Sequence, residues 1–405
     1  MILNINYFVG KQLKANMFKS EQQKKKFLNE ENSFLLFLII LFLQNREMKR
    51  IVLSLLSISI CLCINHRSVQ DTLIAEMDNE HINEHDQLIF RNWMLEYGKS
   101  YDNDFTAIHR MQIFMRNKKN VEKHNHVGAK YKAKLNEFSD QDYDELALKM
   151  FMHIDFQDDD FKFSNPHFFS KQDIKELRNH PILTQMREQA TKGDSLDWSN
   201  KVPSSKPQGT CGSCWAFSSS DVAISRLALK GKEDLTQLSK THLIDCCVGD
   251  KNKGCNGGSP IGAYKFINDN GALKENEYRD YDATQQDCQK PGGHIGKGLI
   301  VDVQKVDDPN FEQIKEALQD GPVTALMYAD KSWFEYGGGI IDTCSYVGAK
   351  ELSHAVVIVG YGKDHYKVKN SWGPGWGENG FFQVQRNGAP ECLDKIKKIS
   401  YPIIQ

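Results

Sequence analysis

The segment Gly209–Phe217 constrains this chain more than any other, because it places a cysteine at the start of a helix. Cys214 follows a glycine-rich turn, and the residues from Trp215 to Ile224 continue with apolar side chains at helical spacing. Unpaired backbone N–H groups and the positive end of a helix dipole favour a thiolate at such a position. We therefore expect the pKa of Cys214 to lie below neutral and its sulfur to act as a nucleophile.

A nucleophilic thiol needs a general base, and the base needs an orienting partner. His354 opens a run of apolar, mostly β-branched residues that is typical of a buried strand. Asn370 ends a second short strand, 16 residues after the histidine. A hairpin of that length can return the amide oxygen to the imidazole and fix its tautomer. Taken singly, His354 is more often a core histidine and Asn370 a turn residue, so their joint spacing carries the prediction.

In this order, the three segments resemble the papain family of cysteine proteases, of the cathepsin L-like kind. His354 and Asn370 lie 140 and 156 residues after Cys214, close to a spacing already known for that family. The resemblance covers roughly residues 85–145 and 190–405. It implies that Cys214 is the nucleophile, His354 the general base and acid, and Asn370 the orienting partner.

The resemblance also assigns the groups around the reacting bond. Gln208 matches the side-chain amide that joins the Cys214 backbone N–H in an oxyanion hole. Trp372 matches the indole that shields the histidine–asparagine pair from water. Gly257 and Gly258 match the backbone strip that pairs with an extended substrate. The walls of the main specificity pocket are expected at Ser259, Pro260, Leu326 and Ala355.

The floor of that pocket is expected near Lys397 or Lys398, since the spacing from Cys392 to Tyr401 leaves the register open. A lysine that reaches inward predicts tolerance for an acidic residue two positions before the cleaved bond. The alternative is that both lysines are solvated, and then no acidic preference is expected.

The chain contains 10 cysteines, two of which lie in an apolar leader. Similarity to the family implies three disulfides, a framework that is typical of an oxidising compartment. The implied pairs are Cys211–Cys255, Cys246–Cys288 and Cys344–Cys392. Besides the nucleophile, Cys247 is then left over, and it either replaces Cys246 in its bridge or remains a buried thiol.

Residues 48–66 have a basic start and a short apolar core, the anatomy of a secretory signal peptide. Neither this run nor the upstream run 34–43 reaches the length of about 18 to 20 residues that spans a bilayer. We therefore expect a secretory-pathway protein without a membrane anchor, destined for a lysosome, a digestive vacuole or the exterior. Because a complete signal begins at Met48, we hypothesise that residues 1–47 are an upstream extension that is not translated.

Residues 67–190 are expected to form an inhibitory propeptide whose helical core covers about 85–145. Phe90, Trp93 and Tyr97 recur at three- and four-residue spacing, and a similar period continues to residue 125. This period predicts two amphipathic helices that pack through aromatic side chains. On its own, such a stretch could equally be a helical interaction module.

The pattern resembles the propeptide of cathepsin L-like proteases but departs from it at two positions. Thr106 stands where the family has glutamate, and Lys134 stands where it has glycine. Both changes could weaken folding of the propeptide. The following residues, 141–190, are expected to cross the active site and to include an extra helix near 173–177.

Residues 191–405 are long enough for two packed halves around a cleft. Up to about residue 300 the signals are helical, and after it five strand patterns and one helix at 311–319 follow. We expect an α+β, papain-like two-domain fold, with the thiol on the helical side and the imidazole on a barrel-like side.

The resemblance implies a cysteine endopeptidase, made as a secreted zymogen, that works through a thiolate–imidazolium pair and an acyl-enzyme without metal or cofactor. We expect a monomer whose partners are peptide substrates and its own propeptide. A formal net charge of −2 argues against nucleic-acid binding. Two alternatives stay open: a thiol–disulfide oxidoreductase in which Cys211 pairs with Cys214, and a catalytically silent binding protein.

Overall fold

Helices and strands alternate in the N-terminal region, and strands predominate after residue 300. The structure, a computed structural model, describes residues 84–150, 152–153, 195–249, 251–329, 333–342, 352–386 and 396–405. All of these belong to one structural unit, Glu84–Gln405. Within the described ranges, no helix is both long enough and apolar enough to cross a bilayer. Several expectations fall outside the described residues. They are the upstream extension, the signal peptide, most of the segment expected to cross the active site, the helix near 173–177, the domain boundary at residues 190 and 191, and the disulfide Cys344–Cys392.

Two helices open the described chain and pack through aromatic rings, as the spacing predicts. They are α4 (Glu84–Glu96) and α5 (Asp104–His126). The buried rings of Phe90 and Trp93 lie 5.3 and 4.9 Å from the ring of Phe114, measured between centroids. These contacts stabilise the helix pair because each ring removes a large apolar area from water.

The N-terminal region (residues 84–153) keeps regular local structure at both positions where it departs from the family pattern. Thr106 donates its backbone N–H to the Oδ1 atom of Asn103 at 2.9 Å, which caps α5. Lys134 donates its backbone N–H to the carbonyl oxygen of Glu335 at 2.7 Å. The backbone hydrogen bonds around both positions are therefore intact.

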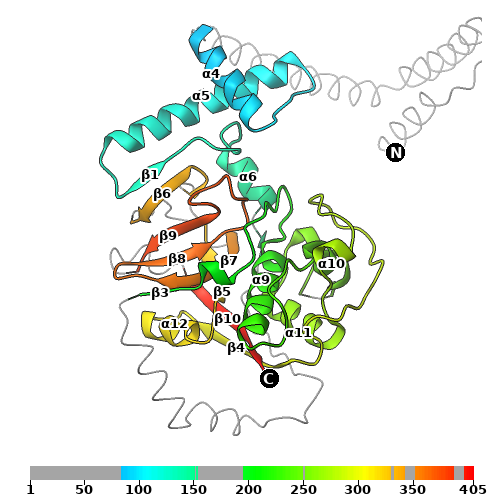
Figure 1. Cartoon of the computed structure of the whole chain (residues 1–405). Coiled ribbons are helices and arrows are strands. Elements are labelled where there is room, and N and C mark those ends of the chain that lie inside the picture. Colours follow the sequence, from blue (N-terminus) through cyan, green and yellow to red (C-terminus); the bar gives the residue numbers. More distant parts are fainter. Residues whose placement is uncertain are drawn as a thin grey trace, which may run out of the picture. The chain divides into compact units, whose positions relative to one another are not determined.

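Two short strands join the N-terminal region to the sheet of the following region, and the first of them, β1, is labelled in Figure 1. β1 (Tyr131–Ala133) pairs antiparallel with β6 (Tyr336–Ile341). β2 (Met152–His153) pairs antiparallel with the first residues of β7 (Leu352–Tyr361). Because β7 carries His354, the pairing of β2 brings the N-terminal region beside the predicted base.

A helix, α6 (Tyr143–Met150), begins the segment in which we expected the crossing of the active site. It forms because its apolar residues share one face, on which Leu146 and Met150 are buried. Arg110 of α5 donates two hydrogen bonds to the Glu145 carboxylate, at 2.6 and 2.8 Å, and so holds α5 against α6. Apart from Met152 and His153, the rest of the segment expected to cross the active site lies outside the described residues.

The first half of the C-terminal region (residues 195–405) is helical, as expected. Its central helix, α9 (Cys214–Leu229), is buried over almost its whole length. α10 (Lys240–Cys246) and α11 (Pro260–Asn270) pack against α9. Each of these two follows a serine whose hydroxyl accepts a backbone N–H of the first turn. Short 3₁₀ turns lie at Ser199–Lys201, Gly254–Asn256 and Glu275–Glu277.

The second half is built on a sheet with the strand order β1, β6, β9, β8, β7, β5, β10, β4, and β3 also pairs with β7. The elements not yet located are β3 (Leu196–Asp197), β4 (Ile300–Asp307), α12 (Phe311–Leu318), β5 (Val323–Tyr328), β8 (His365–Lys369), β9 (Phe381–Gln385) and β10 (Ile396–Ile404). The five strand patterns and the helix expected after residue 300 are therefore all present. In Figure 1 the strands gather beside α9, which packs against β7.

Sequence patterns do not predict β6 and β10. In β6, three consecutive glycines, Gly337–Gly339, remove the side chains that mark a strand. In β10, Lys397, Lys398 and Pro402 interrupt the apolar pattern. Both strands form because neighbours on each side supply the hydrogen-bonding partners and the burial.

Two of the three implied disulfides lie within the described residues, and both are present. Cys211 is bonded to Cys255 and Cys246 to Cys288. Cys247 is a buried thiol, and its Sγ atom accepts a hydrogen bond from the side-chain amide of Asn252 at 2.9 Å. Of the two alternatives for Cys247, the structure therefore selects the buried thiol.

A buried ion cluster ties the helical half to the sheet. Asp221 of α9 accepts hydrogen bonds from Lys240 of α10, at 2.9 Å, and from Lys369 of β8. All three side chains are less than 5% exposed. Burial alone would raise the pKa of Asp221, but the two ammonium groups outweigh it and hold the pKa below its usual range. The carboxylate is therefore ionised and bridges the two halves.

Candidate active site

The predicted nucleophile lies where the sequence places it. Cys214 is the first residue of α9 and is fully buried. The turn before it is held by the Cys211–Cys255 disulfide and by the N–H of Gly212, which donates to the carbonyl oxygen of Cys255 at 2.8 Å. Residue 212 must be glycine, because a Cβ atom there would lie 2.6 Å from the same oxygen. The sulfur accepts the backbone N–H of Ala355 at 3.4 Å, which places it beside β7.

The predicted base and its orienting partner are in direct contact. The Nε2 atom of His354 lies 2.7 Å from the Oδ1 atom of Asn370. Since that carbonyl oxygen can only accept, Nε2 carries the proton, which fixes the tautomer. The same oxygen accepts the backbone N–H of Ser371 at 2.8 Å. The indole of Trp372 stacks on the imidazole with 5.3 Å between centroids and excludes water from this side, as expected.

The side chain of Gln208 is fixed at both ends. Its Oε1 atom accepts the hydroxyl hydrogen of Ser371 at 2.6 Å. Its Nε2 atom donates to the carbonyl oxygens of Cys211, at 2.9 Å, and of Met150, at 3.0 Å. Met150 is the last residue of α6 and belongs to the N-terminal region. Its carbonyl oxygen therefore accepts a hydrogen bond from the Gln208 Nε2–H group, the donor that the resemblance assigns to the oxyanion. Sequence reasoning did not identify Ser371, whose only signal is its place directly after Asn370.

Burial sets the ionisation of the site in the full chain. It raises the pKa of the Cys214 thiol to about 12, and the N–H groups of Ala355, Trp215 and Cys214 itself only partly oppose this effect. Burial also lowers the pKa of His354 to about 4, although the hydrogen bond with Asn370 raises it in part. The expected pKa below neutral is therefore wrong for the full chain, because desolvation outweighs the helix terminus. Thiol and imidazole are both neutral at pH 7.

The N-terminal region covers the histidine side of the site with aromatic and polar contacts. The ring of Phe138 meets the rings of Trp372 and Phe334 edge to face, at 5.7 and 5.8 Å. Asn136 donates its side-chain N–H to the carbonyl oxygen of Phe334. His354, on which Trp372 stacks, has no exposed surface.

The expected substrate strip lies beside the nucleophile. A Cβ atom at Gly258 would come within 2.6 Å of the Trp215 indole, so only glycine fits there. Gly257 has φ of +105°, a left-handed value that favours glycine. Ser259 and Pro260 then start α11. The structure thus places Gly257 and Gly258 next to the start of α9, and Ser259 and Pro260 directly follow them in the chain.

The other expected pocket residues form a row across one face of the sheet. Ala355 lies opposite Leu326 in the pairing of β7 with β5, and Leu326 lies opposite Lys398 in the pairing of β5 with β10. Directly opposed residues of antiparallel strands project to the same face. The Lys398 side chain is only 8% exposed and pairs with Asp307 at 3.1 Å. The interpretation that both lysines are solvated is therefore wrong for Lys398.

Comparisons with known proteins identify the family. Residues 192–403 match the papain family of cysteine proteases, and residues 90–146 match the cathepsin propeptide inhibitor domain. This chain belongs to the papain family of cysteine proteases. It is 33% identical to papaya proteinase 4 of Carica papaya, over 86% of this chain and 97% of that protein. It is 30% identical to cathepsin L1 of Drosophila melanogaster, over 78% of this chain and 84% of that protein.

Solved structures of family precursors show the same fold. The structure of digestive procathepsin L 3 from the Tenebrio molitor larval midgut matches 80% of this chain and all of its own, with a TM-score of 0.62 at 27% identity. The fold is thus papain-like, with a propeptide ahead of a peptidase region, and the protein is a cysteine endopeptidase made as a zymogen. The propeptide is its intramolecular inhibitor. An oxidoreductase is not supported, because Cys211 is bonded to Cys255.

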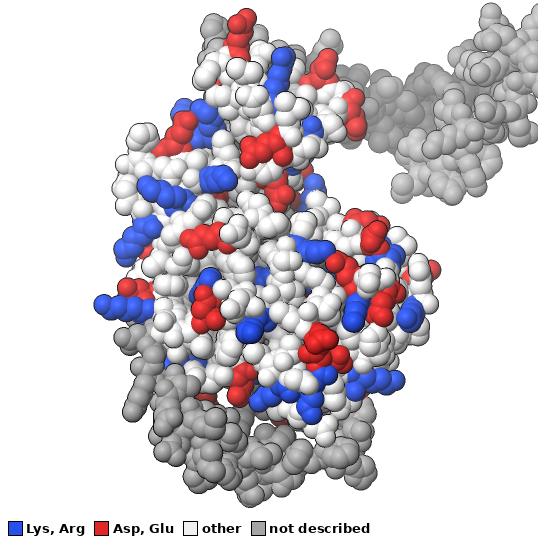
Figure 2. Space-filling view, viewed as in Figure 1, with Lys and Arg blue, Asp and Glu red and all other residues white. Residues whose placement is uncertain are grey.

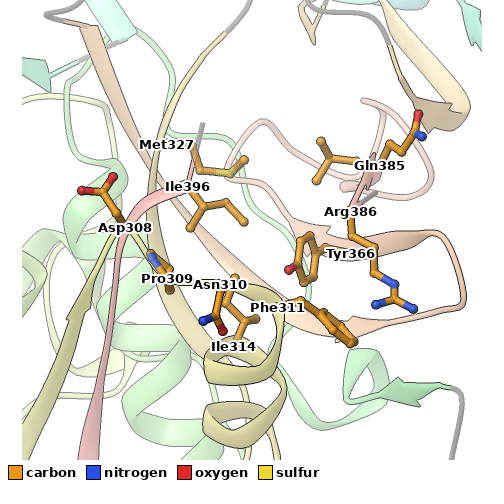
Figure 3. A pocket seen from close by; sticks show the side chains of 11 residues that line it. Asp308, Pro309, Asn310, Phe311, Ile314, Met327, Tyr366, Gln385, Arg386 and Ile396 are labelled. Atoms are coloured by element: carbon orange, nitrogen blue, oxygen red, sulfur yellow. The ribbon is translucent and has the colours of Figure 1, made fainter. Parts of the chain in front are cut away.

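One well-defined cavity of this papain-family protein is separate from the thiol. It has a volume of about 300 Å³ and lies between the first turn of α12 and the strands β8 and β9 (Figure 3). Met327, Tyr366 and Ile314 form its apolar wall, and Arg386 lies at its side. None of the described residues that line it belongs to the predicted catalytic set.

Proposed function

We propose that Cys214, His354 and Asn370 together hydrolyse peptide bonds once the propeptide is removed. The observation that carries this proposal is the 2.7 Å contact of the His354 Nε2 atom with the Asn370 Oδ1 atom. The residue after His354, Ala355, donates its backbone N–H to the Cys214 sulfur, so the thiol contacts β7 one residue after the imidazole. Because Nε2 is held by Asn370, the Nδ1 atom exchanges the proton with the thiol. The imidazolium then stabilises the thiolate that attacks the substrate carbonyl.

The oxyanion that forms in this attack needs donors that are already oriented. Gln208 supplies its Nε2–H group, since Ser371 fixes the other end of its amide. The backbone N–H of Cys214 supplies the second donor. His354 returns its proton to the leaving amine, and water then releases the acyl group from the sulfur with the imidazole as base. No step requires a metal or an organic cofactor.

We also propose where the enzyme acts and how it matures. Two disulfides in the peptidase region support a secretory destination, in a lysosome, a digestive vacuole or the exterior. The signal peptide corresponds to residues 48–66, the propeptide to residues 67–190, and the mature enzyme begins near Thr191. Figure 2 shows lysine and arginine side chains interspersed with aspartate and glutamate over the visible face, which supports peptide rather than nucleic-acid substrates. The proposed mature form is a monomer.

Titration with an epoxysuccinyl reagent tests the proposal. After acid activation we expect one equivalent of reagent to alkylate Cys214 and to abolish hydrolysis of peptide substrates in proportion. Peptide mapping locates the label, and Cys247 is the internal control because it is a buried thiol outside the site. Hydrolysis that persists after full labelling of Cys214, or a label on any other cysteine, would refute the assignment.

Lys398 is proposed to set the substrate preference of this site. Ala355 donates its backbone N–H to the Cys214 sulfur, and Lys398 lies at the end of the row formed by Ala355 and Leu326. Its partner carboxylate, on Asp307, is 55% exposed and can turn to solvent. An acidic substrate side chain can then take its place, so we propose that glutamate or aspartate is accepted two positions before the cleaved bond.

A positional-scanning peptide library measures this preference. We expect Lys398→Ala to lower the ratio of the cleavage rates for glutamate and leucine at that position by about tenfold, as loss of one charge-assisted hydrogen bond predicts. Lys397→Ala is the matched control, because Lys397 pairs with Asp308 and is 28% exposed. A wild-type enzyme without acidic cleavage, or an equal effect of both variants, would rule out a role for Lys398.

A further inference from the structure

One tyrosine hydroxyl connects the two parts of the chain that hold the proposed oxyanion donors. Tyr281 donates its hydroxyl hydrogen to the backbone carbonyl oxygen of Gln208. The same hydroxyl oxygen lies 2.8 Å from the Oγ atom of Ser213, so it accepts the serine hydrogen. Gln208 and Ser213 bracket the turn that leads into α9, and Cys214 follows directly. A single side chain therefore fixes both ends of this turn.

The position of Tyr281 is itself well determined. Its ring meets the ring of Phe217, on α9, edge to face at 5.1 Å. Two residues earlier, Arg279 donates to both carboxylate oxygens of buried Asp245, at 2.8 and 3.0 Å. Two residues after Tyr281, Ala283 packs closely on the turn. A Cβ atom added at Gly209 would lie 2.9 Å from the Cβ atom of Ala283. The segment that carries the hydroxyl is thus anchored on both sides.

Burial keeps this hydroxyl protonated at neutral pH. It raises the pKa of Tyr281 above its ordinary value, although the hydrogen bond with Ser213 acts in the opposite direction. A protonated phenol can donate to one partner and accept from another at the same time. The two hydrogen bonds of Tyr281 use both capacities.

We propose that Tyr281 is a positioning residue for the oxyanion hole of this enzyme. It does not touch the substrate and acts through its two hydrogen-bond partners. The position of Gln208 sets the direction of the Gln208 side-chain amide, and the position of Ser213 sets the direction of the N–H of the next residue, Cys214. The inference rests on the proposed function. Its consequence is specific: loss of the hydroxyl disturbs stabilisation of the tetrahedral intermediate but leaves the reactivity of the sulfur unchanged.

Tyr281→Phe removes the hydroxyl and keeps the ring contact with Phe217. In the processed enzyme we expect kcat to fall about five- to tenfold with KM unchanged, as the loss of one buried hydrogen bond predicts. Binding of a peptide aldehyde, which forms a tetrahedral adduct with an oxyanion, is expected to weaken by the same factor. The rate of alkylation of Cys214 by iodoacetamide, which forms no oxyanion, is expected to stay the same.

Two further variants make the test decisive. Tyr278→Phe is the matched control, because its hydroxyl accepts the N–H of Gln289 at 3.0 Å, away from the turn, and we expect no change in kcat. Ser213→Ala removes only one of the two contacts and is expected to give a smaller fall than Tyr281→Phe. All rates are normalised to active sites titrated with the epoxysuccinyl reagent, so a partly misfolded variant does not alter the comparison.

Two results would overturn the proposal: unchanged aldehyde affinity in Tyr281→Phe, or a parallel fall in aldehyde affinity and alkylation rate. The first shows that the hydroxyl does not orient the donors, and the second shows a general disturbance of the site. Both differ from a failure of the proposed function, in which the wild-type enzyme itself neither hydrolyses peptides nor reacts at Cys214.

Discussion

Removal of the propeptide raises the rate at which iodoacetamide alkylates Cys214 by at least about 10²-fold at pH 7. With a pKa of about 12, only about one thiol in 10⁵ is ionised at this pH in the precursor. In the processed enzyme we expect a helix-terminal thiol with a pKa well below neutral, which is almost fully ionised at pH 7. A thiolate of low pKa is a weaker nucleophile, but this offsets only part of the gain in thiolate fraction. Mass spectrometry of the alkylated peptides, sampled over time, gives both rates.

The pH dependence of the same reaction separates the two states. In the precursor the rate is expected to rise about tenfold per pH unit between pH 6 and 9, because the thiolate fraction grows tenfold per unit below the pKa. In the processed enzyme the rate is expected to be flat over that range. Cys247 is an internal control, since burial raises its pKa to about 12 as well and it lies outside the site. A flat profile for Cys214 in the precursor would show that the thiolate exists before processing.

Asp221→Asn is expected to destabilise the precursor by about 3 to 5 kcal/mol, the cost of leaving buried charges without a partner. Two ammonium groups, on Lys240 and Lys369, depend on this one carboxylate, and all three side chains are buried. The loss of stability is expected at neutral pH, where the native carboxylate is ionised. A lower denaturant midpoint, measured in the Cys214→Ala background to prevent self-processing, reports the effect.

Two comparisons identify the cause of that destabilisation. Asp197→Asn is the matched control, because Asp197 pairs with Lys367 on the same strand β8 but is half exposed, and we expect the midpoint to stay unchanged. Replacing Lys240 and Lys369 by methionine in the Asp221→Asn background is expected to restore much of the lost stability. If the triple variant is as unstable as the single one, uncompensated charge is not the reason.

The proposed catalytic set has a local sequence signal at each member. Cys214 follows a glycine turn at a helix start, His354 opens an apolar strand, and Asn370 ends the next strand before a turn. Short-range preferences fix these elements, and a hairpin of 16 residues limits where the last two can meet. The helices and five strands of the peptidase region followed from apolar periodicity for the same reason.

Other features depend on contacts between residues far apart in the chain, so periodicity could not reveal them. β6 and β10 have glycines, lysines and a proline where a strand pattern is expected, and they form because neighbouring strands pair with them. Tyr281 has no sequence signal at all, and its role appears only where its hydroxyl meets Gln208 and Ser213. Which of the two lysines lies opposite Leu326 likewise became known only from the pairing of β10 with β5, where Leu326 faces Lys398.

The sequence by itself determined the family resemblance and the order of the proposed catalytic residues, since these depend on residue types at fixed spacing; the resemblance in turn implied the two disulfides that the described residues contain. Only the tertiary structure decided the ionisation of the site. A helix terminus favours a thiolate, but burial in the full chain removes water from Cys214 and His354, and the desolvation penalty exceeds the effect of a few N–H groups. That balance depends on which segments cover the sulfur, which no local pattern records.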